Sequence, residues 1–276
     1  MGIVNVTPDS FSDGGRFVAA EAAIEHGRQL VGEGAAILDV GGESTRPGSE
    51  PVGAEQELER VLPVLEGLAA SDWRGARPQI SIDTRKAAVA RAALVAGATL
   101  VNDVSALRDP EMASVIAEGG ADCCLMHMRG EPRTMQDDPR YEDVVDEVKA
   151  FLEERLALAV EEGIDEQRVL LDPGIGFGKT DEHNLELLRR LDEIVALGRP
   201  VVVGTSRKGF LGRIGQAPPG GERVAATLAT NVLAFERGAS VFRVHDVAPA
   251  RESLLVAAAT LGARWTAKSR ATTPTS

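Results

Sequence analysis

The chain has 276 residues, with 42 acidic side chains against 30 basic ones and a formal net charge of −12 at pH 7. A surface this negative repels phosphate backbones and anionic headgroups, so we expect neither nucleic acid nor a membrane surface as a partner. No uninterrupted apolar stretch reaches the roughly 18 residues of a membrane span, and we see no signal-like apolar block near the N-terminus.

Eight apolar runs rich in β-branched residues each end on a polar or charged side chain and then enter a Gly-rich or polar segment. Such runs are typical of strands buried on both faces of a parallel sheet. In chain order they cover residues 2–5, 36–39, 80–83, 100–103, 123–127, 169–172, 201–206 and 241–245.

The segments between these runs have the pattern of amphipathic helices, because apolar residues recur every three or four positions. We predict helices within stretches such as 18–33, 55–70, 86–97, 142–162, 185–196 and 224–237. Eight alternating units predict a closed (β/α)8 TIM barrel. Barrels of about 250 residues commonly form one domain. We therefore expect a single domain over residues 1–265 and a frayed tail over 266–276.

In such a barrel the C-terminal ends of all strands meet at one mouth, so polar residues that are distant in sequence would converge there. This convergence favours an enzyme. Three long polar connections, 7–17, 41–53 and 209–221, follow strand ends on the same face. We expect them to act as lids, the third as a mobile cover, and ordinary loop insertion is the alternative.

The segment 172–180, DPGIGFGKT, has the glycines of a nucleotide-binding loop but not their spacing. Pro173 stands where a phosphate-binding P-loop requires its first glycine. Gly174, Gly176 and Gly178 form G-x-G-x-G, whereas the dinucleotide fingerprint is G-x-G-x-x-G. Both nucleotide motifs fail. What remains is Asp172 at a strand end, followed by glycines that allow another group to approach the backbone closely.

Asp83 and Asp172 end two of the predicted strands, and Asn102 lies on the strand predicted over 100–103, so all three would face the same mouth. A carboxylate accepts two parallel N–H bonds, and an amide both donates and accepts, so this set suits a flat heterocycle with guanidine-like donors. The alternative is structural: each carboxylate caps a helix or pairs with a nearby cation, as Asp83 could do with Arg85 or Lys86.

The other predicted strand ends contribute cations and hydroxyl groups. The loops that follow the seventh and eighth strands of barrels frequently bind phosphate, which suggests an anion site. Arg243 and His245 are two apart in a strand and should face the same way. A structural Arg–carboxylate pair is the competing account. The candidates are Thr45, Arg46, Ser206, Arg207, Lys208, Arg243 and His245.

The sequence contains no cage of protein ligands for a metal ion. The four histidines lack H-x-H and H-E-x-x-H spacing. Cys123 and Cys124 should point to opposite faces of a strand, so we interpret them as core residues and expect a reducing cytoplasm. A Mg²⁺ ion held mainly by substrate phosphates is compatible with the sequence, with Asn5 as its oxygen ligand.

Seven motifs in these segments span almost the whole chain. They are MGIVNVTPDSFSDGG at 1–15, GGESTRPG at 41–48, SIDT at 81–84, NDVS at 102–105, DPGIGFGKT at 172–180, SRKGFLG at 206–212 and RVHD at 243–246. In sequence and order they resemble the dihydropteroate synthases of the folate pathway. The resemblance implies a (β/α)8 barrel, usually a homodimer, that joins 6-hydroxymethyl-7,8-dihydropterin diphosphate to 4-aminobenzoate and releases diphosphate.

The resemblance also assigns roles to residues by their positions in the motifs. The implied pterin pocket consists of Asp83, Asn102, Asp172 and Lys208. Mg²⁺ would bind Asn5, and the diphosphate would meet Thr45, Arg243 and His245. The 4-aminobenzoate site would form from Phe11, Arg46, Pro47, Ser206 and Lys208.

The implied mechanism starts with loss of diphosphate, which leaves a pterin-stabilised cation for the amine to attack. Mg²⁺, Arg243 and His245 would neutralise the leaving group, and Asp9 would stabilise the cation. Closed loops would exclude water. We expect Lys208 to be required for turnover.

Two other functions are open at this point. A methyl transferase that uses methyltetrahydrofolate and a corrinoid partner would share the pterin-facing residues but has no use for the anion site. A silent folate-binding or regulatory paralogue would share both. Family members commonly carry a short segment ahead of MGI, so strand one is expected to fray. Because Phe11, Pro47 and Ser206 are the ordinary family residues, we expect sulfonamide sensitivity.

Overall fold

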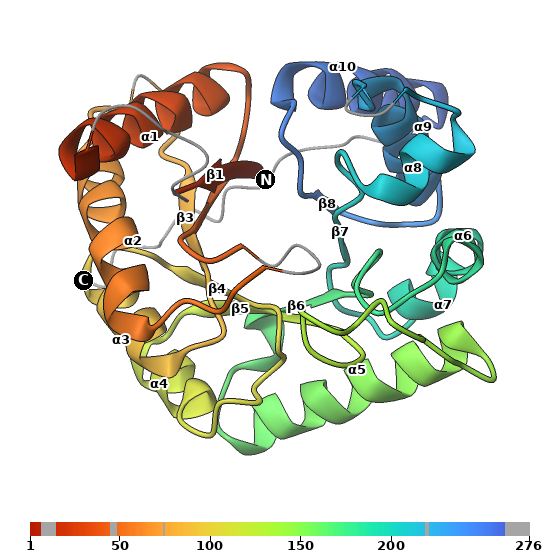
Figure 1. Ribbon diagram of the computed structural model, residues 1–276, viewed down its shortest axis with the longest axis horizontal. Helices are drawn as coiled ribbons and strands as arrows, with labels where there is room; N and C mark the ends of the chain where they lie inside the picture. The colour runs from red at the N-terminus through yellow and green to blue at the C-terminus, as the bar shows by residue number, and fades with distance from the viewer. Residues whose placement is uncertain (7–14, 45–48, 74, 219–220, 263–276) are drawn as a thin grey trace.

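A computed structural model of the chain describes residues 1–6, 15–44, 49–73, 75–218 and 221–262. Within these residues eight parallel strands form the centre of the molecule, ringed by helices (Figure 1). The strands are β1 (Gly2–Asn5), β2 (Ile37–Gly41), β3 (Gln79–Asp83), β4 (Leu100–Asp103), β5 (Asp122–Met126), β6 (Val169–Asp172), β7 (Val202–Val203) and β8 (Val241–Phe242).

Strands β1 to β6 pair in sequence order, and β7 pairs with β8. Two isolated parallel bridges join these two sheets, one between Leu171 and Val201 and the other between Gly2 and Val244. The backbone N–H of Ile3 donates to the carbonyl of Val244 over 3.1 Å, and the N–H of Val244 donates to the carbonyl of Met1 over 2.9 Å. The predicted closed (β/α)8 barrel is thus confirmed, and β1 is paired on both sides.

Helices follow the strands and cover the outside of the barrel (Figure 1). Two begin with side-chain caps: Asp143 accepts from two N–H groups at the start of α5, and Thr180 forms a capping box with His183 at the start of α6. The helices are α1 (Gly15–Gly32), α2 (Ala54–Ala69), α3 (Ala87–Val95), α4 (Met112–Gly119), α5 (Val144–Glu161), α6 (Asp181–Arg189), α7 (Leu191–Val195), α8 (Gly209–Ile214), α9 (Val224–Glu236) and α10 (Val247–Thr260).

The structure corrects three of the predicted elements. The helix predicted over 185–196 is divided at Arg190 into α6 and α7, because Arg190 has non-helical backbone angles. The connection 209–221, predicted as a mobile cover, begins with α8, whose Phe210 and Leu211 are buried. The seventh and eighth strands are two residues long, so the runs 201–206 and 241–245 continue as turns.

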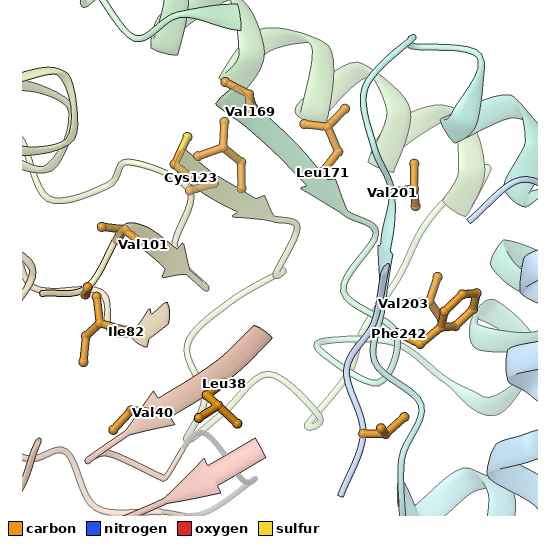
Figure 2. Close-up of a cluster of buried hydrophobic side chains, with 14 of the residues drawn as sticks. Leu38, Val40, Ile82, Val101, Cys123, Val169, Leu171, Val201, Val203 and Phe242 are labelled. Atoms are coloured by element: carbon orange, nitrogen blue, oxygen red, sulfur yellow. The ribbon is translucent and has the colours of Figure 1, made fainter. Parts of the chain in front are cut away.

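The apolar core lies between the barrel wall and the helices. Alternate strand residues face this layer, since successive side chains in a strand point to opposite faces. Cys123 belongs to the layer, whereas Cys124, the next residue in β5, is not part of it and faces the inside of the barrel. Burial and Asp172 raise the pKa of the Cys124 thiol well above its usual value. Figure 2 labels ten members: Leu38, Val40, Ile82, Val101, Cys123, Val169, Leu171, Val201, Val203 and Phe242.

The inner face of the barrel is more polar than the sequence pattern suggested. Asp39, Ser81 and Asn102 alternate with the outward apolar residues, and all three are buried. The expected tail over 266–276 lies outside the described residues. Among those that are described, no helix is both long and apolar enough for a membrane span.

Candidate active site

A cavity of about 1520 Å³ opens at the C-terminal ends of the strands, the end at which barrels of this type carry active sites. The cavity is lined by predicted site residues that come from six different strands and from the turns after them. The structure therefore brings together the carboxylate–amide set and the cationic set. The predicted residues on its wall are Asn5, Asp83, Asn102, Asp172, Ser206, Arg207, Lys208, Arg243 and His245.

Five of the predicted site residues lie outside the described part of the chain. The segments that contain them are 7–14 and 45–48, and the nearby Asn5 and Ser44 both line the cavity. The five residues are Asp9, Phe11, Thr45, Arg46 and Pro47.

Asp39 is a central residue of the site that sequence reasoning did not select. Its Oδ2 accepts from Nε of Arg243 over 2.6 Å and from the amide of Asn102 over 3.0 Å. Its Oδ1 accepts from the hydroxyl of Ser81 over 2.6 Å. The signal was present, because Asp39 ends the predicted run 36–39 as Asp83 ends the run 80–83. Asp39 is fully buried beneath the cavity and fixes both Arg243 and Asn102.

Asp83 shares the same guanidinium, since Nη2 of Arg243 donates to its Oδ2 over 2.7 Å. Burial disfavours the Arg243 cation, but Asp39 and Asp83 outweigh it and raise the pKa of Arg243. The single positive charge of Arg243 is thus shared between the carboxylates of Asp39 and Asp83. It only partly offsets the effect of burial on Asp83. Burial, opposed by Arg243 and reinforced by Asp39, raises the pKa of Asp83 to about 7. Asp83 can therefore change its protonation state near neutral pH.

The cations next to Asp83 in sequence do not pair with it. Lys86 binds Glu43 over 2.6 Å and Glu57 over 2.5 Å. Arg85 binds Glu43 over 3.3 Å and also contacts Glu131. The local pairing considered for Asp83 is therefore wrong, and its partner Arg243 comes from the far end of the chain.

Asp172 is oriented by the glycine-rich turn that follows it. Its Oδ1 accepts from the N–H of Gly174 over 2.7 Å, and burial raises its pKa. Lys208 contacts the same turn, because its Nζ donates to the carbonyl of Ile175 and lies 4.2 Å from the ring centroid of Phe177. Burial lowers the pKa of Lys208 to about 7, although Asp172 favours the charged form. An acid and an amine thus line one cavity with pKa values displaced toward neutrality.

The turn after β7 directs two functional side chains inward. Arg207 adopts a φ of 58°, uncommon for a residue with a side chain, and forms a two-point ion pair with Asp246 at 2.6 and 3.1 Å. Ser206 and Lys208 on either side of it line the cavity. The hydroxyl of Ser206 lies 2.9 Å from Nδ1 of His245, and the N–H of His245 donates to that hydroxyl over 3.1 Å. This network joins the turns that follow β7 and β8.

No group of three or more acidic, His or Cys side chains with metal-site geometry occurs among the residues that the structure describes. Asn5, at the end of β1, presents an amide to the cavity. A neutral oxygen donor of this kind is a suitable single protein ligand for Mg²⁺, which keeps most of its water or phosphate oxygens.

The comparisons with known proteins agree with this geometry. The model of the family described as pterin binding enzyme matches residues 1–245. The dihydropteroate synthase of Escherichia coli (strain K12) is 45% identical over 266 residues, which are 96% of this chain and 92% of that protein. That of Synechocystis sp. is 48% identical over 248 residues, 90% of this chain and 84% of its own length.

Solved structures give the same result. Xanthomonas albilineans dihydropteroate synthase with 4-aminobenzoic acid has a TM-score of 0.87 at 48% identity and covers 96% of this chain and 93% of its own. The same enzyme in complex with 7,8-dihydropteroate has a TM-score of 0.84 at 45% identity, covering 96% and 94%. The Yersinia pestis enzyme with a sulfonamide drug has a TM-score of 0.88 at 42% identity, covering 95% and 94%.

The fold, the cavity and these matches define a pterin-binding barrel enzyme. The chain belongs to the pterin binding enzyme family and, within it, to the dihydropteroate synthases. The resemblance drawn from the sequence motifs is thereby confirmed, and the corrinoid-dependent methyl transferase is not favoured.

Proposed function

We propose that the cavity condenses 6-hydroxymethyl-7,8-dihydropterin diphosphate with 4-aminobenzoate to give 7,8-dihydropteroate and diphosphate. The observation that carries this proposal is the meeting of Asp83, Asn102 and Asp172 with Lys208, Arg243 and His245 on one cavity wall. The acid and amide groups suit the donor-rich pterin ring. The cations suit the leaving diphosphate.

The pterin ring would bind between Asp83, Asn102 and Asp172, with Lys208 beside it. Charge-assisted hydrogen bonds of this kind contribute about 1.5–3 kcal/mol each. The amide of Asn102 is held by Asp39, and the carboxylate of Asp172 is held by Gly174, so both are oriented before the ligand arrives. Such preorganisation reduces the entropy lost on binding.

The diphosphate would bind at Arg243, His245 and Thr45. Nε and Nη2 of Arg243 are engaged with Asp39 and Asp83. These bonds use two of the five guanidinium N–H donors, so others remain for a phosphate oxygen. The Ser206 hydroxyl beside Nδ1 of His245 would fix the imidazole ring while its other nitrogen meets the anion.

We include Mg²⁺ as the cofactor, with Asn5 as its protein ligand. When bound, the ion would neutralise charge that develops on the departing diphosphate. Arg243 and His245 would stabilise the same charge from the protein side, because fixed cations in a dry cavity interact more strongly than cations in water. Asp9 would then stabilise the pterin cation. Phe11, Arg46, Pro47 and Ser206 would orient the aminobenzoate, with Lys208 bordering both ligands.

Three further expectations belong to this proposal. We infer a homodimer, supported by exposed apolar side chains on the neighbouring helices α9 and α10, where Leu233 is 46% and Val256 63% exposed. Light scattering coupled to gel filtration measures the mass in solution. We place the enzyme in the cytoplasm, in keeping with its two buried free cysteines. We retain a single domain over 1–265.

A diphosphate-release assay with the pterin diphosphate, 4-aminobenzoate and Mg²⁺ tests the function. Release that requires both substrates, with dihydropteroate detected by chromatography, supports the synthase. Pterin binding without release would instead identify a silent paralogue. Arg91→Ala is a control, because Arg91 forms an exposed ion pair with Glu118 between α3 and α4 and should leave turnover unchanged.

A further inference from the structure

Lys179 is a buried amine that the proposed reaction does not use. It follows the glycine-rich turn after β6, and only 3% of its surface is exposed. Its Nζ lies 2.8 Å from Nδ1 of His127 and 3.0 Å from the carbonyl oxygens of both Gly174 and Phe177. The carbonyl oxygen of His127 lies 3.5 Å from the same nitrogen. An ammonium group has three N–H donors and no acceptor, so the three shorter contacts can use all of its donors. The ion pairs found among the described residues include none to Lys179.

His127, which directly follows β5, completes this arrangement. Burial and the adjacent Lys179 lower the pKa of His127 to about 2, so its imidazole is neutral near neutral pH. A neutral ring with the proton on Nε2 presents Nδ1 as an acceptor to Lys179. The ring is itself fixed, because it packs edge-on against Phe151 with centroids 4.9 Å apart.

Lys179 contacts a turn that other bonds also hold: Asn184 accepts from the N–H of Gly176 over 2.6 Å, and Gln136 donates to the Gly176 carbonyl over 2.7 Å. Lys179 adds bonds to the carbonyls of Gly174 and Phe177. Gly174 has a φ of 65°, and a Cβ there would lie 1.8 Å from the carbonyl oxygen of His127, so only glycine fits. The Gly174 residue is bonded at both ends: its N–H donates to Asp172, and its carbonyl accepts from Lys179. Lys179 therefore acts on Asp172 through one residue.

The second carbonyl that Lys179 holds connects it to the other side of the cavity. Phe177 accepts from Lys179 at its backbone, while its ring lies beneath the ammonium group of Lys208. The carbonyl of Ile175, between the two bonded carbonyls, accepts from Lys208. The amines of Lys179 and Lys208 thus bond carbonyl groups of the same turn.

We propose that Lys179 is a positioning residue for the pterin site, which holds the turn of residues 174–177 through the carbonyls of Gly174 and Phe177 and thereby orients the Asp172 carboxylate. The inference rests on the proposed function. A buried ammonium group without a carboxylate partner carries a desolvation cost. An apolar side chain of similar length would fill the same space without that cost, so packing alone does not account for the amine.

The test compares Lys179→Met with the wild type by fluorescence titration of 6-hydroxymethylpterin, in the presence of diphosphate and Mg²⁺. We expect the Kd to rise at least tenfold and the KM for the pterin diphosphate to rise with it. Because Lys179 acts through Asp172, adding Lys179→Met to an Asp172→Asn variant should change the Kd by less than twofold. In an Asp83→Asn variant the tenfold effect should persist.

Two further variants separate positioning from stability. Val64→Ala removes buried volume from α2 on the outside of the barrel, so it should lower the Tm without changing the Kd. His127→Leu removes one acceptor of Lys179 and leaves the turn carbonyls in place, so it should raise the Kd less than Lys179→Met does. If Lys179→Met does not fold, His127→Leu is used as the test variant in its place.

A folded Lys179→Met protein with a wild-type Kd would overturn the inference and leave the proposed function intact. Equal losses in the Asp172→Asn and wild-type backgrounds would overturn it as well, since Lys179 would then act independently of Asp172. A wild-type protein that neither binds the pterin nor turns over would overturn the proposed function and the inference with it.

Discussion

Arg243 and Asp39 are 204 positions apart in the chain, yet Nε of Arg243 donates to Oδ2 of Asp39 over 2.6 Å beneath the cavity. The bond matters because Asp39 is fully buried and Arg243 mostly so. A charge removed from water in this way is tolerated only when it is paired. Asp39 therefore sets the position of the cation that we assign to the diphosphate.

We predict that Asp39→Asn lowers both stability and turnover. Loss of one partner from a buried ion pair costs about 3–5 kcal/mol, and the remaining Asp83 would offset part of this. We expect a fall of about 3 kcal/mol in the free energy of unfolding, measured by urea denaturation. Glu118→Gln, in the exposed pair with Arg91, should change it by less than about 0.5 kcal/mol. Equal effects of the two substitutions would contradict the assignment.

Lys208→Ala and Asp83→Ala should each remove most of the turnover while the protein stays folded. Each loses a charge-assisted contact to the pterin, so kcat/KM should fall by about 100-fold or more, equivalent to about 2.7 kcal/mol. Steady-state kinetics measures the loss, and far-ultraviolet circular dichroism verifies the fold. Near-normal rates in both variants would refute these roles.

The pH dependence of kcat/KM should report Lys208. Because burial lowers the pKa of Lys208 to about 7, the ammonium form disappears as the pH rises through 7. We assign pterin binding to the charged form of Lys208, so kcat/KM should fall above this pH. Lys208→Arg keeps its charge at higher pH and should remove the alkaline decline, even if the rate is lower. An unchanged decline in Lys208→Arg would assign it to another group.

The stability of the protein should depend on Asp83 in the acidic range. Burial raises the pKa of Asp83 in the folded state to about 7, above its ordinary value of 3.8. The folded state therefore binds more protons than the unfolded state between these values. The contribution of Asp83 is fully present below pH 3.8 and is lost as the pH rises through 7. Urea denaturation at several pH values should show this slope, and Asp83→Asn should reduce it.

Arg207 should matter for activity more than for stability. Its ion pair with Asp246 is largely exposed at the Arg207 end, so it contributes at most about 1 kcal/mol. Arg207→Gly tolerates the positive φ but removes one of the links between the turns that carry Ser206 and His245, whose own hydrogen bonds remain. We expect kcat/KM to fall about tenfold, or about 1.4 kcal/mol, with the Tm nearly unchanged. A wild-type rate would show that the turns stay aligned without the pair.

Sulfonamides should inhibit turnover in competition with 4-aminobenzoate. The Yersinia pestis relative has been solved with such a drug, and this chain has Ser206 on the cavity wall. Inhibition should weaken as the aminobenzoate concentration rises, which initial-rate measurements detect. Sustained turnover at high sulfonamide and low aminobenzoate would contradict this prediction.

The sequence predicted most of the barrel, because strand periodicity and polar strand ends are local signals. The ranges 2–5, 100–103 and 169–172 coincide with β1, β4 and β6. The short β7 and β8 were not predictable, because their apolar runs continue after pairing stops. Helix α8 was missed because its glycines favour a loop, whereas burial of Phe210 and Leu211 stabilises the helix.

Which residues belong to the site was predictable, because strand ends converge at one mouth. Which of these side chains bond to one another was less predictable. Arg243 could be placed at the mouth from sequence, but its bonds to Asp39 and Asp83 depend on which residues face inward in the closed barrel. Lys179 and His127 were overlooked as a pair because neither forms a motif with the other, and their contact exists only after β5 and β6 lie side by side.

The barrel consists of six strands in one sheet and two in another, joined by isolated bridges. The acids Asp39 and Asp83 belong to the larger sheet, and Arg243 follows the last strand of the smaller one. Its two ion pairs therefore cross the boundary between unequal parts of the enzyme. A polyanion that draws this guanidinium toward itself would weaken that attachment, so substrate turnover and cohesion of the barrel depend on the same side chain.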